Sequence, residues 1–217
     1  MNGTIASRTR KIVRESAELT KILALPFAIL VIGLSVVGGA LQIFSSESAA
    51  QIFSNIGIFL AGGIINYRSL QICRPHQYFT PRLKGLFGLS LLSGAGIMLG
   101  GLLFILPGIF LYLRWFIAWP ILVGEQSSIF EAMKMSWHRT RRWEWAICVP
   151  VAILALLFLI AIVGLVFSGV SIEKPDGLLD AFIANAVLNG IVLLTNIIAV
   201  AAYACINRDM DSVLTSA

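Results

Sequence analysis

Charged residues are scarce in this chain: 12% of its 217 residues are Asp, Glu, Lys or Arg, about half the share found in an average soluble domain. The polar sequence that remains is too limited to form a separate soluble domain. The chain has only two His and three Cys, and neither set shows the spacing of a metal site or a disulfide framework. The motifs GxSxG and HExxH and the P-loop are also absent, so the sequence predicts no catalytic residue, no cofactor and no metal.

Apolar sequence fills the chain instead, and it is gathered into six runs of about 20 residues. That length crosses a hydrocarbon core of roughly 30 Å at about 1.5 Å per residue. Backbone groups in lipid must be satisfied within their own segment, which favours helices. The sequence therefore predicts an all-α, polytopic integral membrane protein. Its six transmembrane helices are expected at about 22–44, 52–73, 85–106, 108–123, 145–169 and 178–206.

Basic residues are found in every second connection between the apolar runs. Lys and Arg precede the first run, return in the second and fourth connections and follow the last run, whereas the first loop has only the acidic Glu47. The positive-inside rule then places both termini in the cytoplasm. The net charge of +5 is thus a topology signal, and no basic groove with stacking aromatics indicates nucleic-acid binding. We expect a cytoplasmic basic amphipathic lead segment at 1–21, the transmembrane domain at 22–206 and a cytoplasmic tail at 207–217.

The fourth run is short and starts with a Pro-Gly pair. Pro107 cannot continue a helix in the usual way and Gly108 tolerates positive φ, so a tight reversal is expected at 106–108. The run from 108 to 123 would be about 24 Å long, which is short for a full crossing. Either it crosses a locally thinned bilayer, or it forms a re-entrant hairpin with the third run.

Arg114 is the costliest residue in the apolar runs, because a charge at mid-membrane costs at least about 2.5–3.5 kcal/mol. No Asp or Glu lies in the interior of any run to neutralise it, so we expect polar partners: Asn66, Asn185, Asn189 and Asn196. The last three share one helix face. They could line a pathway or a headgroup site, or they could join helices by hydrogen bonds. Arg114 itself fits a functional and a structural role equally.

A cytoplasmic amphipathic helix is expected between the fourth and fifth transmembrane helices. Ser128 and Glu131 form a capping-box pattern, and the helix would run to about Trp143. Its apolar residues would lie among lipid headgroups, and its cations would contact anionic phospholipid. The alternative is a connector whose charges only enforce topology. The candidate lipid-facing residues are Lys134, Arg139, Arg141 and Arg142.

One stretch, LPGIFLYLRWFIAWPILVGEQSSIFEAMKMSWHRTRRW, covers about a fifth of the chain and carries its most specific motif. It resembles the membrane domain attached to some bacterial glycerophosphodiester phosphodiesterases and found in stand-alone YciC-like membrane proteins. The resemblance implies a multi-pass protein of the bacterial plasma (inner) membrane. It carries over no catalytic residue, because the phosphodiesterase activity belongs to a soluble barrel that is absent here. The matching residues are Pro107, Gly108, Arg114, Trp115, Pro120, Glu125, Ala132, Ser136, Trp137 and Thr140.

These patterns favour a non-enzymatic membrane module of uncharacterised role that binds anionic lipid, or a membrane partner, in envelope organisation or lipid handling. The alternative is a small transporter or permease component for an anionic substrate, with Arg114 and the Asn residues near the midplane. A membrane enzyme is the third hypothesis. It lacks support, because neither His76 nor His138 has a nucleophile and an acid nearby in the sequence.

Overall fold

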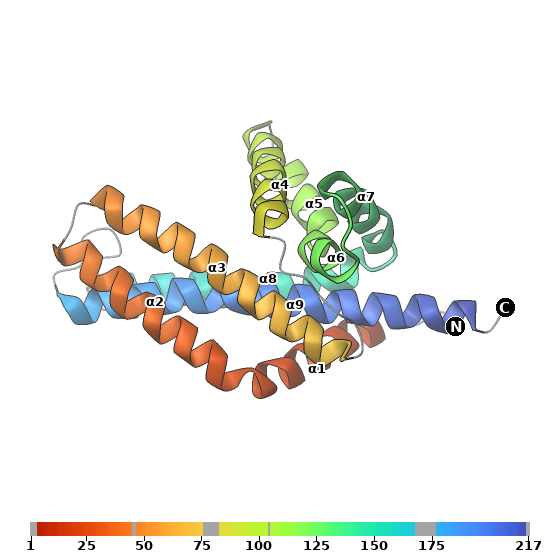
Figure 1. The fold of residues 1–217 in the computed structure, drawn as a ribbon, viewed down its shortest axis with the longest axis horizontal. Helices are drawn as coiled ribbons and strands as arrows, with labels where there is room; N and C mark the ends of the chain where they lie inside the picture. Colours follow the sequence, from red (N-terminus) through yellow and green to blue (C-terminus); the bar gives the residue numbers. More distant parts are fainter. Residues whose placement is uncertain (1–3, 45–46, 76–82, 104, 168–176, 216–217) are drawn as a thin grey trace. The chain divides into compact units, whose positions relative to one another are not determined.

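The computed structural model describes residues 4–44, 47–75, 83–103, 105–167 and 177–215, and every regular element within these ranges is a helix (Figure 1). Six of the described segments are long and apolar enough to cross a membrane, which confirms the prediction of an all-α polytopic protein. His76, and Arg82 of the second connection, lie outside the described residues. The helices are α1 (Ile5–Ile22), α2 (Ala24–Phe44), α3 (Glu47–Cys73), α4 (Leu83–Leu103), α5 (Ile105–Trp115), α6 (Ala118–Gly124), α7 (Ile129–Thr140), α8 (Glu144–Phe167) and α9 (Leu178–Leu214).

The predicted reversal at 106–108 is wrong, because these residues lie in the first turn of α5. A proline is tolerated there, since the first N–H groups of a helix have no partner within the helix. Pro107 therefore opens α5 instead of turning the chain. The connection between α4 and α5 includes residue 104, which lies outside the described ranges.

The fourth run is two helices instead of one. α5 ends at Trp115 and α6 begins at Ala118, with a turn between them. Pro120 explains the break: it has no N–H to donate to the carbonyl of Phe116, and its ring would collide with that carbonyl in a continuous helix. The broken segment Leu106–Gly124 is still apolar enough to be one candidate span, with 56% of it buried.

Two other helices are longer than their apolar runs. α3 begins at Glu47, five residues before the predicted start, and α9 continues past the predicted end at 206 to Leu214. Neither extension contains Gly or Pro, so nothing in the backbone chemistry stops the helix where hydropathy falls. The cytoplasmic placement of 1–21 and 207–217 stays a prediction.

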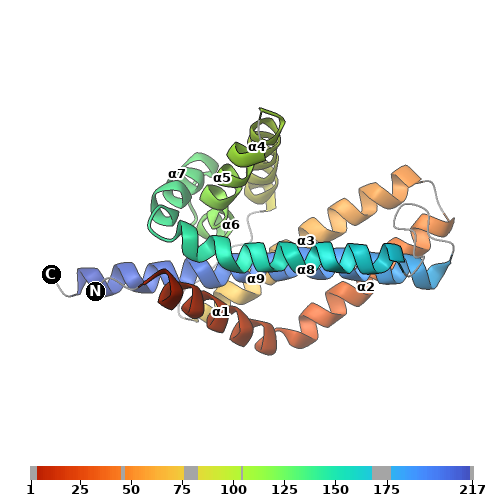
Figure 2. The ribbon, with the colours of Figure 1, turned by 180° about the vertical axis from the view of Figure 1, so that it is seen from behind.

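The chain divides into two compact units. In the first (1–19, 66–150 and 197–217), α4 and α5 lie side by side as a hairpin, which can be followed from both sides (Figures 1 and 2). Glycines permit this close approach: a Cβ on Gly100 would lie 3.3 Å from Gly108. α7 contacts α4, α5 and α6.

The second unit (20–65 and 151–196) is joined by small residues and amides. Gly38 of α2 lies against both α3 and α9: a Cβ there would come within 3.3 Å of Ser54 Oγ and of Asn185 Oδ1. The side-chain amide of Asn185 donates to Gln42 Oε1 at 3.0 Å. The amide of Asn189 donates to Ser35 Oγ at 3.4 Å. Polar groups in this unit thus connect helices, as one of the two predicted roles requires.

Candidate functional site

Arg114, at the end of α5, is buried with 8% of its surface exposed, and its charge is neutralised. Its Nη2 lies 2.8 Å from Glu144 Oε2 at the start of α8. Its guanidinium carbon also lies 4.9 Å from the ring centre of Phe110 and 5.4 Å from that of Trp137. Aromatic faces attract a cation within about 6 Å. An ion pair and two rings thus hold the guanidinium.

The backbone carbonyl of Arg114 is satisfied by two hydroxyl groups of α7. Carbonyls in the last turn of a helix have no partner within it, and α5 ends one residue later. The hydroxyl of Ser136 donates to this carbonyl at 2.7 Å, and the hydroxyl of Thr140 donates at 3.3 Å. Both side chains are fully buried. Their spacing of four residues puts them on one face of α7, so the pair caps the end of α5.

Aromatic packing completes the junction of α4, α5 and α7. The ring of Trp137 meets that of Phe110 edge-on, with centroids 5.6 Å apart, and lies 6.5 Å from that of Trp115. On its other side Trp115 fits over Gly96 of α4, where an added Cβ would come within 2.6 Å of the ring. Five of the predicted motif residues therefore meet in one place: Arg114, Trp115, Ser136, Trp137 and Thr140.

Glu125, also in the predicted motif, belongs to a second cluster at the end of α6. Arg139 of α7 forms a two-bond ion pair with this carboxylate, with one Nη2–Oε2 distance of 2.9 Å. The hydroxyl of Tyr203 on α9 donates to the same carboxylate at 3.1 Å. Gly124 gives that hydroxyl room, because a Cβ there would lie 2.8 Å from it. Arg139 also donates to Asn207 Oδ1 at 3.3 Å. This cluster ties α6, α7 and α9 together.

The predicted polar network is divided between the two units. Arg114 and Asn66 belong to the first unit, whereas Asn185, Asn189 and Asn196 belong to the second. The amide of Asn196 donates to the carbonyl of Val192 in its own helix at 2.9 Å. The ion-pair partner of Arg114 is a carboxylate, Glu144, and not one of these amides.

The capping box of α7 is present as predicted. The Ser128 hydroxyl accepts from the Glu131 N–H, and the Glu131 carboxylate accepts from the Ser128 N–H at 2.9 Å. Hydrogen bonds from the Ser128 N–H and then from its hydroxyl lower the pKa of the Glu131 carboxyl group. Glu131 therefore stays ionised where it caps the helix.

The apolar side of α7 differs from the prediction that it lies among lipid headgroups. Met133 is 9% exposed, and Trp137 packs on Arg114, so this side faces protein. Phe130 is the exception, with 74% of its surface exposed. Of the four predicted lipid-facing cations, Lys134, Arg141 and Arg142 are exposed. Arg139 is turned inward to Glu125, so it departs from the prediction.

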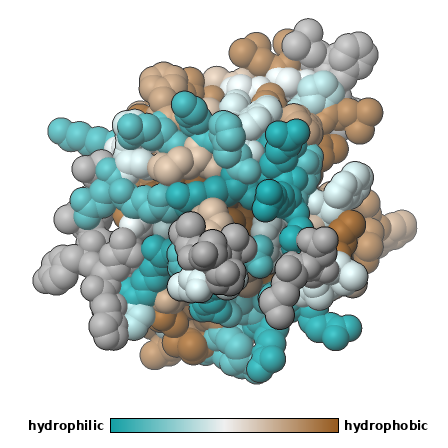
Figure 3. All heavy atoms as spheres, turned by 90° about the vertical axis from the view of Figure 1, so that its right-hand side faces the viewer, coloured by the Kyte–Doolittle hydropathy of each residue, from teal (hydrophilic) through white to brown (hydrophobic). Residues whose placement is uncertain are grey.

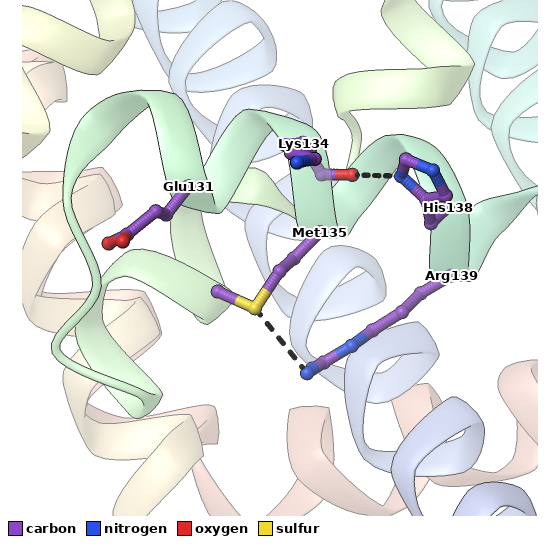
Figure 4. A pocket seen from close by; sticks show the side chains of 5 residues that line it. All are labelled: Glu131, Lys134, Met135, His138 and Arg139. Carbon is purple, nitrogen blue, oxygen red and sulfur yellow. Dashed lines mark hydrogen bonds between the residues drawn. The ribbon is translucent and has the colours of Figure 1, made fainter.

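The outer side of α7 carries a shallow depression of about 530 Å³ (Figure 4). The described residues that line it are Glu131, Lys134, Met135, His138 and Arg139. The Nδ1 atom of His138 lies 2.8 Å from the backbone carbonyl oxygen of Lys134. Seen from the end of the first unit at which both termini lie, hydrophilic side chains cover much of the surface (Figure 3).

α1 is fixed to this same end by charged contacts. Glu15 forms a two-bond ion pair with Arg208 of α9, at 2.8 and 2.9 Å. Arg8 donates to the backbone carbonyl of Arg142 at 2.6 Å, and its guanidinium carbon lies 5.1 Å from the ring centre of Trp143. The predicted basic lead segment is therefore a helix packed on the protein.

The family model for the membrane domain of glycerophosphoryl diester phosphodiesterase matches residues 90–210, more than half of the chain. The chain belongs to this family. Both clusters, around Arg114 and around Glu125, lie within the match. The match is to a membrane domain, so it assigns no phosphodiesterase residue to this chain. Comparisons with curated proteins and with solved structures return no match.

The main site residue that sequence reasoning missed is Glu144. Glu144 lies outside the apolar runs, just before the fifth one. A usable signal is nevertheless present, because Glu144 is a lone carboxylate after the basic residues Arg141 and Arg142. Phe110 was also missed, although it precedes Arg114 by four residues and so shares its helix face.

Proposed function

We propose that this multi-pass membrane domain is a non-enzymatic module that binds anionic phospholipid headgroups. The binding surface would be the exposed basic surface formed by Lys134, Arg141 and Arg142, on α7 and the turn that follows it. Such a module would act in lipid handling or envelope organisation. A protein partner in the membrane would bind through the same surface.

The inward and the exposed cations of this region differ in whether a carboxylate neutralises them, and this difference supports the proposal. The two inward cations of this region, Arg114 and Arg139, are each neutralised by a carboxylate. The three exposed cations form no ion pair with any carboxylate among the described residues. Their charge is therefore available to an external anion. A cation near an anionic membrane surface contributes about 1 kcal/mol of attraction.

The position of α7 between two candidate spans also supports the proposal. A candidate span ends at Gly124, and the next begins at Glu144. The segment between them holds only α7 and its flanking turns, so both of its ends meet the bilayer on one side. Trp145 is 69% exposed at the start of the second of these spans, and such aromatics are enriched at the level of the headgroups.

Removing the three charges should weaken binding of anionic lipid. In the full chain in a neutral detergent, Lys134→Gln, Arg141→Gln and Arg142→Gln together should raise the Kd for dioctanoyl phosphatidylglycerol at least about tenfold at low salt. The matched control changes Arg10, Arg14 and Lys84 to Gln, which lowers the net charge equally at exposed positions outside α7. Equal loss of binding in both triple variants would contradict a local site.

Orientation follows from the same charges, and we propose that both termini face the cytoplasm of a bacterial cell with the chain in the inner membrane. In a variant with Cys73, Cys148 and Cys205 changed to Ala, an impermeant maleimide on intact cells should label Ser48→Cys. It should label Lys84→Cys only after the membrane is permeabilised. The reverse pattern of labelling would invert the topology and remove the basic surface from the cytoplasm.

The transporter alternative gains less support from the geometry. It needs Arg114 as an anion site, yet the guanidinium is already paired with Glu144 and covered by Phe110 and Trp137. An anionic substrate would have to displace Glu144. The Asn residues of the second unit make hydrogen bonds to α2 and to α9 itself.

A further inference from the structure

The depression on the outer side of α7 presents two groups suited to an anion. Arg139 also lines it, but its guanidinium is occupied by Glu125. Among the described residues that line the depression, the other cationic or titratable donors are Lys134 and His138, both exposed and one helical turn apart. Glu131 opposes an anion, yet its carboxylate is held by Ser128 and is turned away from the imidazole (Figure 4).

The hydrogen bond of His138 fixes which ring nitrogen carries the proton. Nδ1 lies 2.8 Å from the carbonyl oxygen of Lys134, and a carbonyl can only accept. Nδ1 therefore carries the hydrogen, and in the neutral imidazole Nε2 is an acceptor. In the imidazolium, Nε2 is a donor. The Nε2 atom can thus accept or donate a hydrogen bond, while the bond from Nδ1 to the Lys134 carbonyl keeps the ring in one orientation.

This property distinguishes phosphate monoesters from phosphate diesters. A monoester has a second ionisation near pH 6, so at neutral pH it exists both with and without a P–OH group. Neutral imidazole accepts from that P–OH, and imidazolium donates to the ionised oxygen. A diester has no P–OH and carries a single charge, so it loses the bond to neutral imidazole and part of the attraction to Lys134.

We propose that the depression lined by Lys134 and His138 binds a terminal phosphate, that is, a phosphate monoester. This inference rests on the proposed function, because it names the headgroup chemistry for one part of the anion-binding surface. Lys134 attracts the negative charge of the phosphate. The imidazole of His138 favours a monoester over a diester. The monoester is either the headgroup of a lipid such as phosphatidic acid or a soluble compound such as glycerol 3-phosphate.

The test compares three ligands on the full chain in a neutral detergent at pH 7: dioctanoyl phosphatidic acid, dioctanoyl phosphatidylglycerol and glycerol 3-phosphate. The wild type should bind phosphatidic acid about tenfold or more tightly than phosphatidylglycerol, as one hydrogen bond to a charged group requires. His138→Ala should remove that preference. Lys134→Gln should weaken binding of both lipids. Arg10→Gln, an exposed cation outside both the basic surface and the depression, should leave both affinities and the preference unchanged.

The outcomes distinguish a failure of this inference from a failure of the proposed function. Equal binding of the two lipids by the wild type overturns the monoester site but leaves anionic-lipid binding standing. A preference that survives in His138→Ala also overturns it. Binding of neither lipid overturns the proposed function itself. Competition by glycerol 3-phosphate at similar concentrations supports the site with a soluble occupant, and competition by phosphatidic acid alone supports a lipid headgroup.

Discussion

Replacing Glu144 by Gln should lower the free energy of unfolding by about 3 kcal/mol, because it leaves the charge of Arg114 buried without a counterion. The side chains of Arg114 and Glu144 are 10% and 23% exposed, so water replaces the lost attraction only in part. Thermal or detergent-induced unfolding of the purified chain measures the change. The exposed change Lys84→Gln is the control and should have an effect within about 0.5 kcal/mol.

A double variant separates loss of the pair from loss of a single side chain. Removing both charges, in Arg114→Met with Glu144→Gln, leaves no buried cation, so this protein should be more stable than Glu144→Gln alone. Replacing a whole buried pair is often close to neutral, whereas breaking it is costly. If Glu144→Gln unfolds like the wild type, the ion pair contributes nothing to the junction of α5 and α8.

The number of apolar spans and their helical type could be predicted from hydropathy, but the break inside the fourth span could not be placed with the same rule. Pro107 and Pro120 look alike in the sequence, and each is the third residue of a helix, α5 and α6, where no N–H is needed. The two breaks before them differ in hydropathy. The first falls between two apolar runs, whereas the second falls inside the fourth run, where the residues from 109 to 119 are apolar apart from Arg114.

The motif could be found in the sequence, but its grouping in space could not. Six of its residues form two clusters: five lie around Arg114, which is paired with Glu144, and Glu125 is bound by Arg139 and Tyr203. Each of these partners comes from another helix, so local periodicity says nothing about it. The spacing of Ser136 and Thr140 was the one local clue, since two hydroxyls one turn apart suit the capping of a neighbouring helix end.

Separating the inward from the outward cations also needed the structure. Lys134 and Arg139 belong to the same short helix, and charge alone makes them equivalent. Only the place of Glu125, fourteen residues before Arg139, shows that one cation is paired. The basic surface is therefore smaller than the sequence indicates, and the proposed function depends on three cations instead of four.

A single methyl group at Gly108 should disrupt the α4–α5 hairpin. A Cβ at this position would lie 2.9 Å from both the N and the Cα of Gly101, and 3.3 Å from the carbonyl oxygen of Ile97. These are backbone atoms, so relief requires the two helices to move apart. Overpacking of this kind typically costs about 1–3 kcal/mol. We expect Gly108→Ala to lose that amount in the same unfolding measurement, and Gly108→Val to lose more.

The same substitution at the glycine that faces Gly108 across this contact, Gly101, provides the matched control. A Cβ on Gly101 would meet nothing within 4 Å among the described residues, so Gly101→Ala adds no collision. Alanine is favoured over glycine inside a helix by up to about 1 kcal/mol, so this variant should be equal to or more stable than the wild type. The two alanines would then differ by about 1–4 kcal/mol at facing positions in one helix contact. If both variants unfold alike, the backbones of α4 and α5 are not in contact at Gly108, and the close hairpin is wrong.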